Sequence, residues 1–500
     1  MLPLEFWEGT VMSGEVRTLR RELRTIETLA LSVAMMSPVL AMSLYGGAPA
    51  MFVGRAAPLA FVLSGVVVGL VGAGLIYLCR YFSHAGSVYG LTGVTLGPRA
   101  GFFSGWALLG CYLIYTPASA ATAAYFGTLF CKDTGLWSGA DYIPFTILFL
   151  LVIMVLATRD IKRVGQTLLS IEGASLVVML AVLVVVVANL IGGTKGHHLS
   201  AAVFTLPHGV GVHSLVLASI FGFTAFAGFE GAASLGEETK NPRRSVPKAL
   251  TIAIVGAVSF YVLTVAIMAM GFGASDKGGA ALAGSSGPLF DLSRLYISNS
   301  MAEALELGAM ISAFSAALAT TLGSGRLIFA IARDARPSWR LASVGSSGAP
   351  TAALMVVVGL ALVVNVGMRV AGISGLHSAF YLGTIGTLSL LIAYGMVNVG
   401  AARLMMRTAA AKTIVIVPVA GFLILGYTMY NEVHPRPPYP YDIFPYIVIA
   451  WLVVGMALVA LTPGVASRIG RGLSEAEALT RSDGDDEHEL HATQGAARHG

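Results

Sequence analysis

Charged residues are scarce in this 500-residue sequence, where aspartate, glutamate, lysine and arginine together account for 11% of the positions. Hydrophobic residues account for 56%, and the mean hydropathy is +0.78, which excludes an ordinary soluble globular protein. Apolar runs of about 20 residues recur along nearly the whole chain, and each is long enough to cross a bilayer as a helix. The composition therefore predicts an all-α polytopic protein that crosses the cell membrane many times and has the lipid bilayer as its partner.

Cysteine is also scarce, with three residues that predict neither a disulfide framework nor a metal site (Cys79, Cys111 and Cys131). Histidines gather between positions 197 and 213, but their spacing is irregular, so we expect a solvated loop, no metal and no cofactor. The apolar runs carry no convergent set of catalytic groups, so an enzyme is not expected. The net charge of +5 does not indicate nucleic acid, because the basic residues lie in loops between apolar runs.

The N-terminal segment lacks the short apolar stretch and the small-residue cleavage site of a signal peptide. We expect three parts in the chain. Residues 1–25 form a cytosolic segment, and residues 26–462 form the membrane domain. Residues 463–500, which are rich in acids and poor in apolar residues, form a cytosolic and disordered tail.

Twelve apolar segments are long enough to span the membrane. They are 26–47, 58–80, 99–130, 141–158, 165–192, 212–236, 247–272, 301–332, 351–371, 378–402, 412–430 and 442–462. With the N-terminus inside, most of the 31 lysines and arginines fall in cytoplasmic loops. This bias agrees with twelve spans and with both termini in the cytoplasm.

Two of the spans carry signals of an interrupted helix. The first contains Pro38, which removes a backbone donor and should break the helix near residues 36–41; a simple kink is the alternative. The sixth contains GFTAFAGFEG at 222–231, where three glycines interrupt an apolar run. Interrupted helices five spans apart favour an inverted repeat of five helices, with the binding site at the interface between the repeats.

Glu230 and Glu172 lie inside apolar spans, where an ionisable group is costly and usually functional. Glu230 follows the second interruption, and we interpret it as a gating or proton-linked group. Its alternative role is to tie the interrupted helix to its neighbours. Glu172 lies in the fifth span and is either a proton or cation site or a carboxyl group that bonds a neighbouring helix.

A polar segment, EETKNPRRS at 237–245, follows the sixth span. We expect it to lock the cytosolic side of the molecule, with the next helix beginning at Ser245 and Pro247. In the eighth span, small residues recur four positions apart, a spacing that predicts close approach of another helix. They are Ser312, Ala316, Thr320 and Ser324.

The run GFTAFAGFEGAASLGEETKNPRRSVPKAL at 222–250 resembles the sixth helix and following loop of amino acid permeases. These permeases belong to the amino acid–polyamine–organocation superfamily. ISAFSAALATTLGSGRLIFAIARD at 311–334 resembles their eighth helix, and SLLIAYGMVNVGAARLM at 389–405 resembles their tenth. The resemblance implies the LeuT-like inverted-repeat fold, with about twelve transmembrane helices, broken helices 1 and 6, and a secondary transporter that works by alternating access.

The resemblance also implies where a substrate binds. Backbone N–H groups of the first break suit a carboxylate, and carbonyls and side chains of the second suit an ammonium group. The expected residues are Ser37, Pro38, Val39, Leu40, Ala41, Phe223, Thr224, Ala225, Phe226, Ala227 and Gly228. The sequence departs from the family at SPVLAMS (37–43), where many members have a glycine-rich break. It departs again at Glu172, where some proton-coupled relatives have a lysine.

The apolar character of these positions favours a neutral amino acid moved together with a proton. A polyamine or other organocation, an exchange mechanism, and a sodium ion in place of the proton remain alternatives. A membrane sensor that does not transport is a more distant one.

Overall fold

The structure is a computed structural model that describes residues 22–82, 87–159, 161–336, 338–345, 348–407, 413–434 and 436–461, together with 464 and 468. Most of the predicted N-terminal segment 1–25 and nearly all of the predicted tail 463–500 lie outside the described residues. The division of the chain into three parts therefore stays a prediction.

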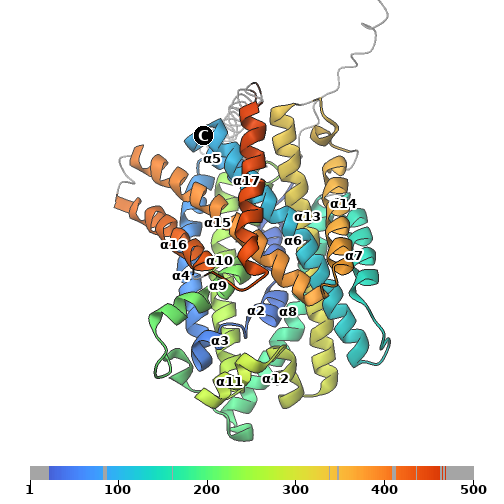
Figure 1. Ribbon diagram of the computed structural model, residues 1–500, viewed down its shortest axis with the longest axis vertical. Helices are drawn as coiled ribbons and strands as arrows, with labels where there is room; N and C mark the ends of the chain where they lie inside the picture. The colour runs from blue at the N-terminus through green and yellow to red at the C-terminus, as the bar shows by residue number, and fades with distance from the viewer. Residues whose placement is uncertain are drawn as a thin grey trace, which may run out of the picture.

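The described residues form a bundle of helices (Figure 1). The first half of the chain contains α1 (Thr25–Met36), α2 (Pro38–Tyr45), α3 (Ala50–Val53), α4 (Ala57–Cys79), α5 (Val88–Leu96), α6 (Pro98–Asp133), α7 (Tyr142–Ala157), α8 (Ile161–Ile191) and α9 (Val212–Phe226). The second half contains α10 (Pro242–Gly271), α11 (Asp276–Gly284), α12 (Pro288–Tyr296), α13 (Asn299–Ala335), α14 (Thr351–Val370), α15 (Gly375–Arg407), α16 (Ile416–Val433) and α17 (Phe444–Leu461). Short 3₁₀ segments include η1 (Gly54–Ala56), η2 (Thr194–Gly196), η3 (Ala201–Phe204), η4 (Phe229–Leu235), η5 (Arg340–Ala342) and η7 (Tyr441–Ile443).

Eleven helical segments of the described chain are long and apolar enough to cross a membrane, and α7 is a shorter apolar helix. Together they agree with the twelve predicted spans. The predicted third and eighth spans became α6 and α13, with 36 and 37 residues. At about 1.5 Å per residue these helices exceed 50 Å, so they extend well beyond a bilayer core of about 30 Å.

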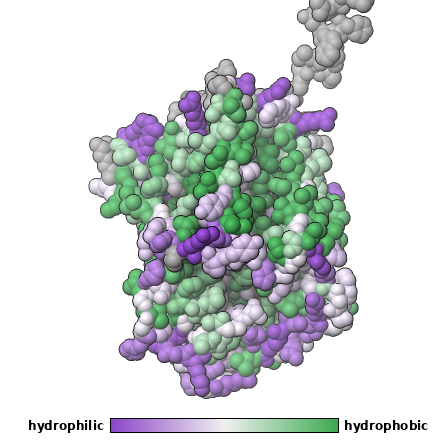
Figure 2. All heavy atoms as spheres, viewed as in Figure 1, coloured by the Kyte–Doolittle hydropathy of each residue, from purple (hydrophilic) through white to green (hydrophobic). Residues whose placement is uncertain are grey.

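The bundle is arranged around α6, against which both α13 and α15 pack. Burial decreases outward, so that α14, α16 and α17 keep many apolar side chains exposed, among them Val363, Leu423 and Val453. Figure 2 shows hydrophobic residues over much of the upper flank and hydrophilic residues at the two ends. Exposed apolar helix faces of this kind fit contact with lipid.

The polar segment 237–245 packs against α13 and the start of the described chain, at the end of the bundle predicted to be cytoplasmic. Its Glu238 forms a buried ion pair with Arg326 of α13, with Nε and Oε2 3.0 Å apart. The backbone N–H groups of Glu22 and Leu23 both donate to the Glu238 carbonyl at 3.0 Å, so the start of the described chain is fixed here too. These contacts hold the segment against α13 and the start of the described chain, and its role in locking the cytosolic side stays a prediction.

The predicted start of the following helix at Ser245 and Pro247 is wrong. Helix α10 begins at Pro242, after Asn241 adopts a left-handed conformation with φ 48°. Proline suits the first position of a helix because no intrahelical partner is needed for its missing N–H. Pro247 lies inside α10, one turn after its start, and this early position accommodates it.

Candidate functional site

The first interruption occurs at one residue, Ser37. Its φ of 45° and ψ of 72° are left-handed, and it separates the end of α1 from the start of α2. Pro38 takes the first position of α2, so the proline begins the second half-helix rather than merely bending the first. The predicted break at residues 36–41 is thus narrower in the structure, and Val39, Leu40 and Ala41 form the first turn of α2.

The second interruption occurs at Ala227 and Gly228. Ala227 has an extended ψ of 134°, and Gly228 has a φ of 104° that side-chain-bearing residues rarely adopt. A Cβ atom built on Gly228 would lie 2.6 Å from the Cβ of Met35, so glycine is also required by close packing. Phe223 to Phe226 lie in the last turn of α9, and the chain continues after the break as the 3₁₀ segment η4.

The two interruptions lie against each other. The Ser32 hydroxyl in α1 donates to the carbonyl of Phe229 at 2.6 Å and accepts from the N–H of Ala232 at 2.8 Å. This one side chain therefore joins α1 to the first turn of η4. Sequence reasoning missed Ser32, because a serine in an apolar helix carries no signal of its distant partner.

At the first interruption, Ser37, Ser312 and Glu172 form a buried polar cluster. The Ser37 hydroxyl donates to the Ser312 carbonyl at 2.6 Å, and the Ser312 hydroxyl donates to Glu172 Oε1 at 2.8 Å. The backbone N–H of Leu40 donates to the Ser312 hydroxyl at 3.3 Å. Glu172 Oε2 has no hydrogen-bond partner among the described residues. The small-residue face predicted on the eighth span thus brings Ser312 into contact with the first break.

Glu230 lies at the second interruption, fully buried, and its carboxyl group is well satisfied. Oε1 accepts from the Tyr112 hydroxyl of α6 at 2.8 Å. Oε2 accepts from the Tyr394 hydroxyl of α15 and from the N–H of Gly228, the latter at 3.1 Å. The carboxyl group therefore joins the break to two other helices, a contact set that the sequence did not reveal.

The predicted aromatic residues of α9 point in different directions. Phe223 packs edge-on against Tyr394, with ring centroids 6.3 Å apart. Phe226 is fully buried and packs against Tyr261 and Phe61, at 4.9 and 6.5 Å. Thr224, unlike Phe223 and Phe226, lines a cavity.

That cavity, which we call the chamber, has a volume of about 340 Å³. It lies between α2, α9, α15 and α16 and is closed by the turn that precedes α17. Its walls include Tyr45, Phe52, Phe221, Thr224, Phe380 and Glu432. Thr224 belongs to the predicted substrate site, so the chamber reaches the neighbourhood of the second interruption.

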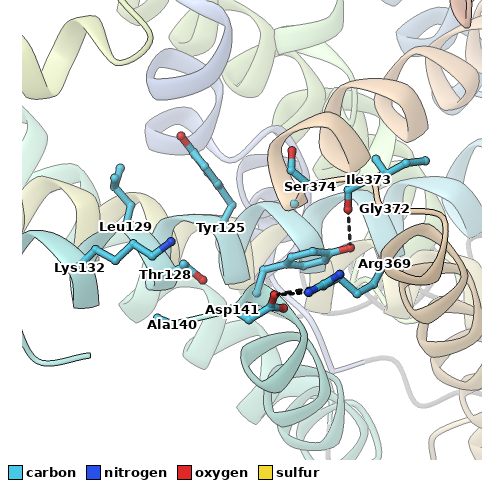
Figure 3. A pocket seen from close by; sticks show the side chains of 12 residues that line it. Tyr125, Thr128, Leu129, Lys132, Ala140, Asp141, Arg369, Gly372, Ile373 and Ser374 are labelled. Carbon is cyan, nitrogen blue, oxygen red and sulfur yellow. Dashed lines mark hydrogen bonds and ion pairs between the residues drawn. The ribbon is translucent and has the colours of Figure 1, made fainter. Parts of the chain in front are cut away.

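Another cavity, of about 380 Å³, lies among the ends of α6, α7, α14 and α15, away from both interruptions (Figure 3). Arg369 pairs with Asp141 at 3.0 Å, and the Tyr142 hydroxyl donates to the carbonyl of Ile373 at 3.1 Å. Asp141 also accepts hydrogen bonds from the Ile143 N–H at 3.0 Å and from Arg369 Nε at 3.1 Å. These contacts join the start of α7 to the end of α14 and to the turn before α15. We therefore interpret them as structural.

Two interrupted helices, five spans apart and packed together inside an apolar bundle, define a membrane transporter of the LeuT-like inverted-repeat class. The sequence profile of the amino acid permease family matches residues 36–435. The chain therefore belongs to the amino acid permease family, as the motifs at 222–250, 311–334 and 389–405 indicate.

Similar proteins include other transporters. An uncharacterized transporter of Mycobacterium tuberculosis is 26% identical over 391 residues, which cover 75% of this chain and 80% of that protein. The branched-chain amino acid permease BcaP of Lactococcus lactis is 24% identical over 401 residues, covering 76% and 80%. The vacuolar cationic amino acid transporter 2 of Arabidopsis thaliana is 26% identical over 304 residues, covering 56% of this chain and 45% of that protein.

Among solved structures, the manganese transporter of Eremococcus coleocola has a similar fold. The TM-score is 0.55 with 11% sequence identity, over 88% of this chain and 95% of that one. At this identity the similarity supports the fold alone. Within the described part of this chain, no group of three or more His, Cys, Asp or Glu side chains is arranged to hold a metal ion.

Proposed function

We propose that this protein is a secondary active transporter that moves a neutral amino acid together with a proton by alternating access. The observation that carries this proposal is the meeting of the two interrupted helices beside the buried Glu172. The first turn of α2 and the end of α9 then form the two sides of the substrate site, as expected for residues 37–41 and 223–228.

A neutral substrate is favoured by the residues around the interruptions. Val39, Ala41, Phe223 and Ala225 are buried and apolar. Glu230 is already bonded to two tyrosine hydroxyls and a backbone N–H, so it has little capacity left for a second positive charge on the substrate. The similarity to a branched-chain amino acid permease agrees with this assignment.

Proton coupling is assigned to Glu172. One of its oxygens accepts a hydrogen bond from Ser312, while the other lacks a partner among the described residues. A buried carboxylate with so few donors is costly, and a proton removes that cost. A substrate carboxylate at the first turn of α2 would add a second negative charge nearby, so that binding of the substrate and of the proton favour each other.

Glu230 is assigned to gating. Its contacts with Tyr112 and Tyr394 join the second interruption to α6 and α15, so movement of the interrupted helix requires these bonds to change. The proposed role is a reversible tie rather than a site for the substrate.

A cationic amino acid or another organocation is the second candidate substrate class. The similarity to a vacuolar cationic amino acid transporter favours it, although that match covers less than half of the relative. Sodium coupling and exchange are alternatives to proton symport.

The test is uptake by proteoliposomes that contain the purified protein, using a panel of neutral, acidic and basic amino acids and amines. Each substrate is measured with an imposed proton gradient, with a sodium gradient, and with neither. We expect neutral amino acids to accumulate under an inward proton gradient. Absence of both uptake and exchange for every compound would contradict the proposal.

A further inference from the structure

The chamber has the construction of a site for a positively charged group. Aromatic side chains form its walls in two pairs: Tyr45 with Phe380, at 6.1 Å between ring centroids, and Phe52 with Phe221, at 6.0 Å. Aromatic faces attract ammonium groups within about 6 Å, and more strongly where water is excluded.

Glu432 adds a carboxyl group to these walls. Among the described residues that line the chamber, it is the one acid, and none of them is basic. No described residue forms a hydrogen bond or ion pair with its carboxyl group, and it lies near the end of α16, next to the turn that closes the chamber. Arg436 in the same turn is held by Asp442 at 2.6 Å, so the adjacent basic side chain is already paired.

An ionised carboxyl group that has no partner among the described residues and lies between apolar and aromatic walls is less well solvated than in bulk water. A cation that enters the chamber restores a partner for this charge, whereas an anion is repelled. The chamber therefore selects for a positively charged group, and its volume of about 340 Å³ is within the range of small-molecule sites.

The chamber lies next to the proposed substrate site, so a molecule bound in it can be on the path of transport. Thr224, in the last turn of α9, forms part of the wall and lies three residues before Ala227 of the second interruption. The opposite boundary is the turn with Pro437 and Pro438, at the end of the bundle predicted to face outside. A molecule in the chamber is thus placed between that end and the interrupted helices.

We propose that the chamber is an entry site that binds the ammonium group of the substrate, and that Glu432 is the residue that recognises it. This inference rests on the proposed function, because it takes the substrate to be an amino acid or amine. The substrate carboxylate finds no basic partner in the chamber, so binding there is weaker than at the interruptions and the substrate can pass on.

Uptake of a transported amino acid is compared in proteoliposomes containing wild-type protein, Glu432→Gln or Glu432→Lys. We expect KM to rise roughly threefold to tenfold in Glu432→Gln, the effect of losing a partly solvated ion pair beside aromatic rings. The maximal rate should stay within about twofold, because the interruptions and Glu172 are untouched. Butylammonium, which has the ammonium group but no carboxylate, should inhibit the wild type more strongly than Glu432→Gln.

Glu303→Gln is the matched control, because it removes the same charge from the start of α13 without altering the chamber wall. Its KM and its inhibition by butylammonium should equal those of the wild type. Transport with unchanged KM and unchanged inhibition in both Glu432 variants would overturn the entry site and leave the proposed function intact. Loss of all transport in the wild type would instead contradict the proposed function.

Discussion

Glu172 and Glu230 are both buried beside a helix interruption, but their neighbours differ. Glu230 accepts hydrogen bonds at both oxygens from two tyrosines and a backbone N–H. Glu172 accepts one from Ser312, and its second oxygen has no partner in the described part of the chain. Because a buried charge needs donors, the two residues suit different tasks. Glu230 is suited to holding the second interruption against α6 and α15. Glu172 is suited to binding and releasing a proton.

The Glu172→Gln variant tests this division at the scale of a residue. Glutamine keeps the shape and the hydrogen bond with Ser312 but cannot exchange a proton. We expect accumulation driven by a proton gradient to fall by about tenfold or more, the size of an ordinary coupling between two sites. Exchange of labelled for unlabelled substrate, which needs no net proton movement, should continue.

Both activities are measured in the same proteoliposomes at several external pH values. Wild-type accumulation should increase as the external pH falls, and that of Glu172→Gln should not. Equal accumulation and equal pH dependence in the two proteins would show that the proton is carried elsewhere.

At the scale of elements, two ion pairs join the polar segment 237–245 to α13, and we expect them to hold this end of the bundle closed. Glu238 and Arg326 are about 95% buried as side chains, whereas Glu237 and Arg333, which also pair, are partly exposed. Removing one partner of a buried pair leaves an uncompensated charge, at a cost of about 3–5 kcal/mol. Arg333 also pairs with Asp334, so it keeps a charged partner when Glu237 is removed and the cost there should be smaller.

Glu238→Gln is therefore expected to open this end of the bundle, and Glu237→Gln, one position away, to change it little. A cysteine introduced at Thr28, whose hydroxyl lies 3.0 Å from that of Thr239, reports the opening. In a background without Cys79, Cys111 and Cys131, it should react with a water-soluble maleimide faster in Glu238→Gln than in Glu237→Gln. Equal labelling rates would show that the buried pair does not hold this end closed.

At the scale of the whole molecule, the distribution of lysine and arginine predicts both termini in the cytoplasm. An epitope added after Gly500 should bind antibody in intact cells only after the membrane is made permeable. An epitope inserted after Gly209, in the loop between η3 and α9, should bind antibody without that treatment. The opposite pattern would reverse the orientation, and the chamber would then lie toward the cytoplasmic end of the bundle.

Most of the fold could be predicted from the sequence, because hydrophobic length alone identifies a helix that crosses a membrane. The two interruptions could be located to within a few residues, because Pro38 and Gly228 have local backbone effects. The partners of the buried acids could not be predicted. Tyr112 and Tyr394 are separated from Glu230 by 118 and 164 positions, and no local pattern records such contacts.

The sequence by itself determined the class of molecule, the number of spans and the family, because these depend on composition and on short motifs such as the one at 222–250. The tertiary structure decided which of two similar buried acids has an oxygen without a partner, and which helix ends surround the chamber with Glu432 in its wall. Those properties depend on which helices, distant in the sequence, come into contact. These contacts result from the packing of the whole bundle and not from any one segment.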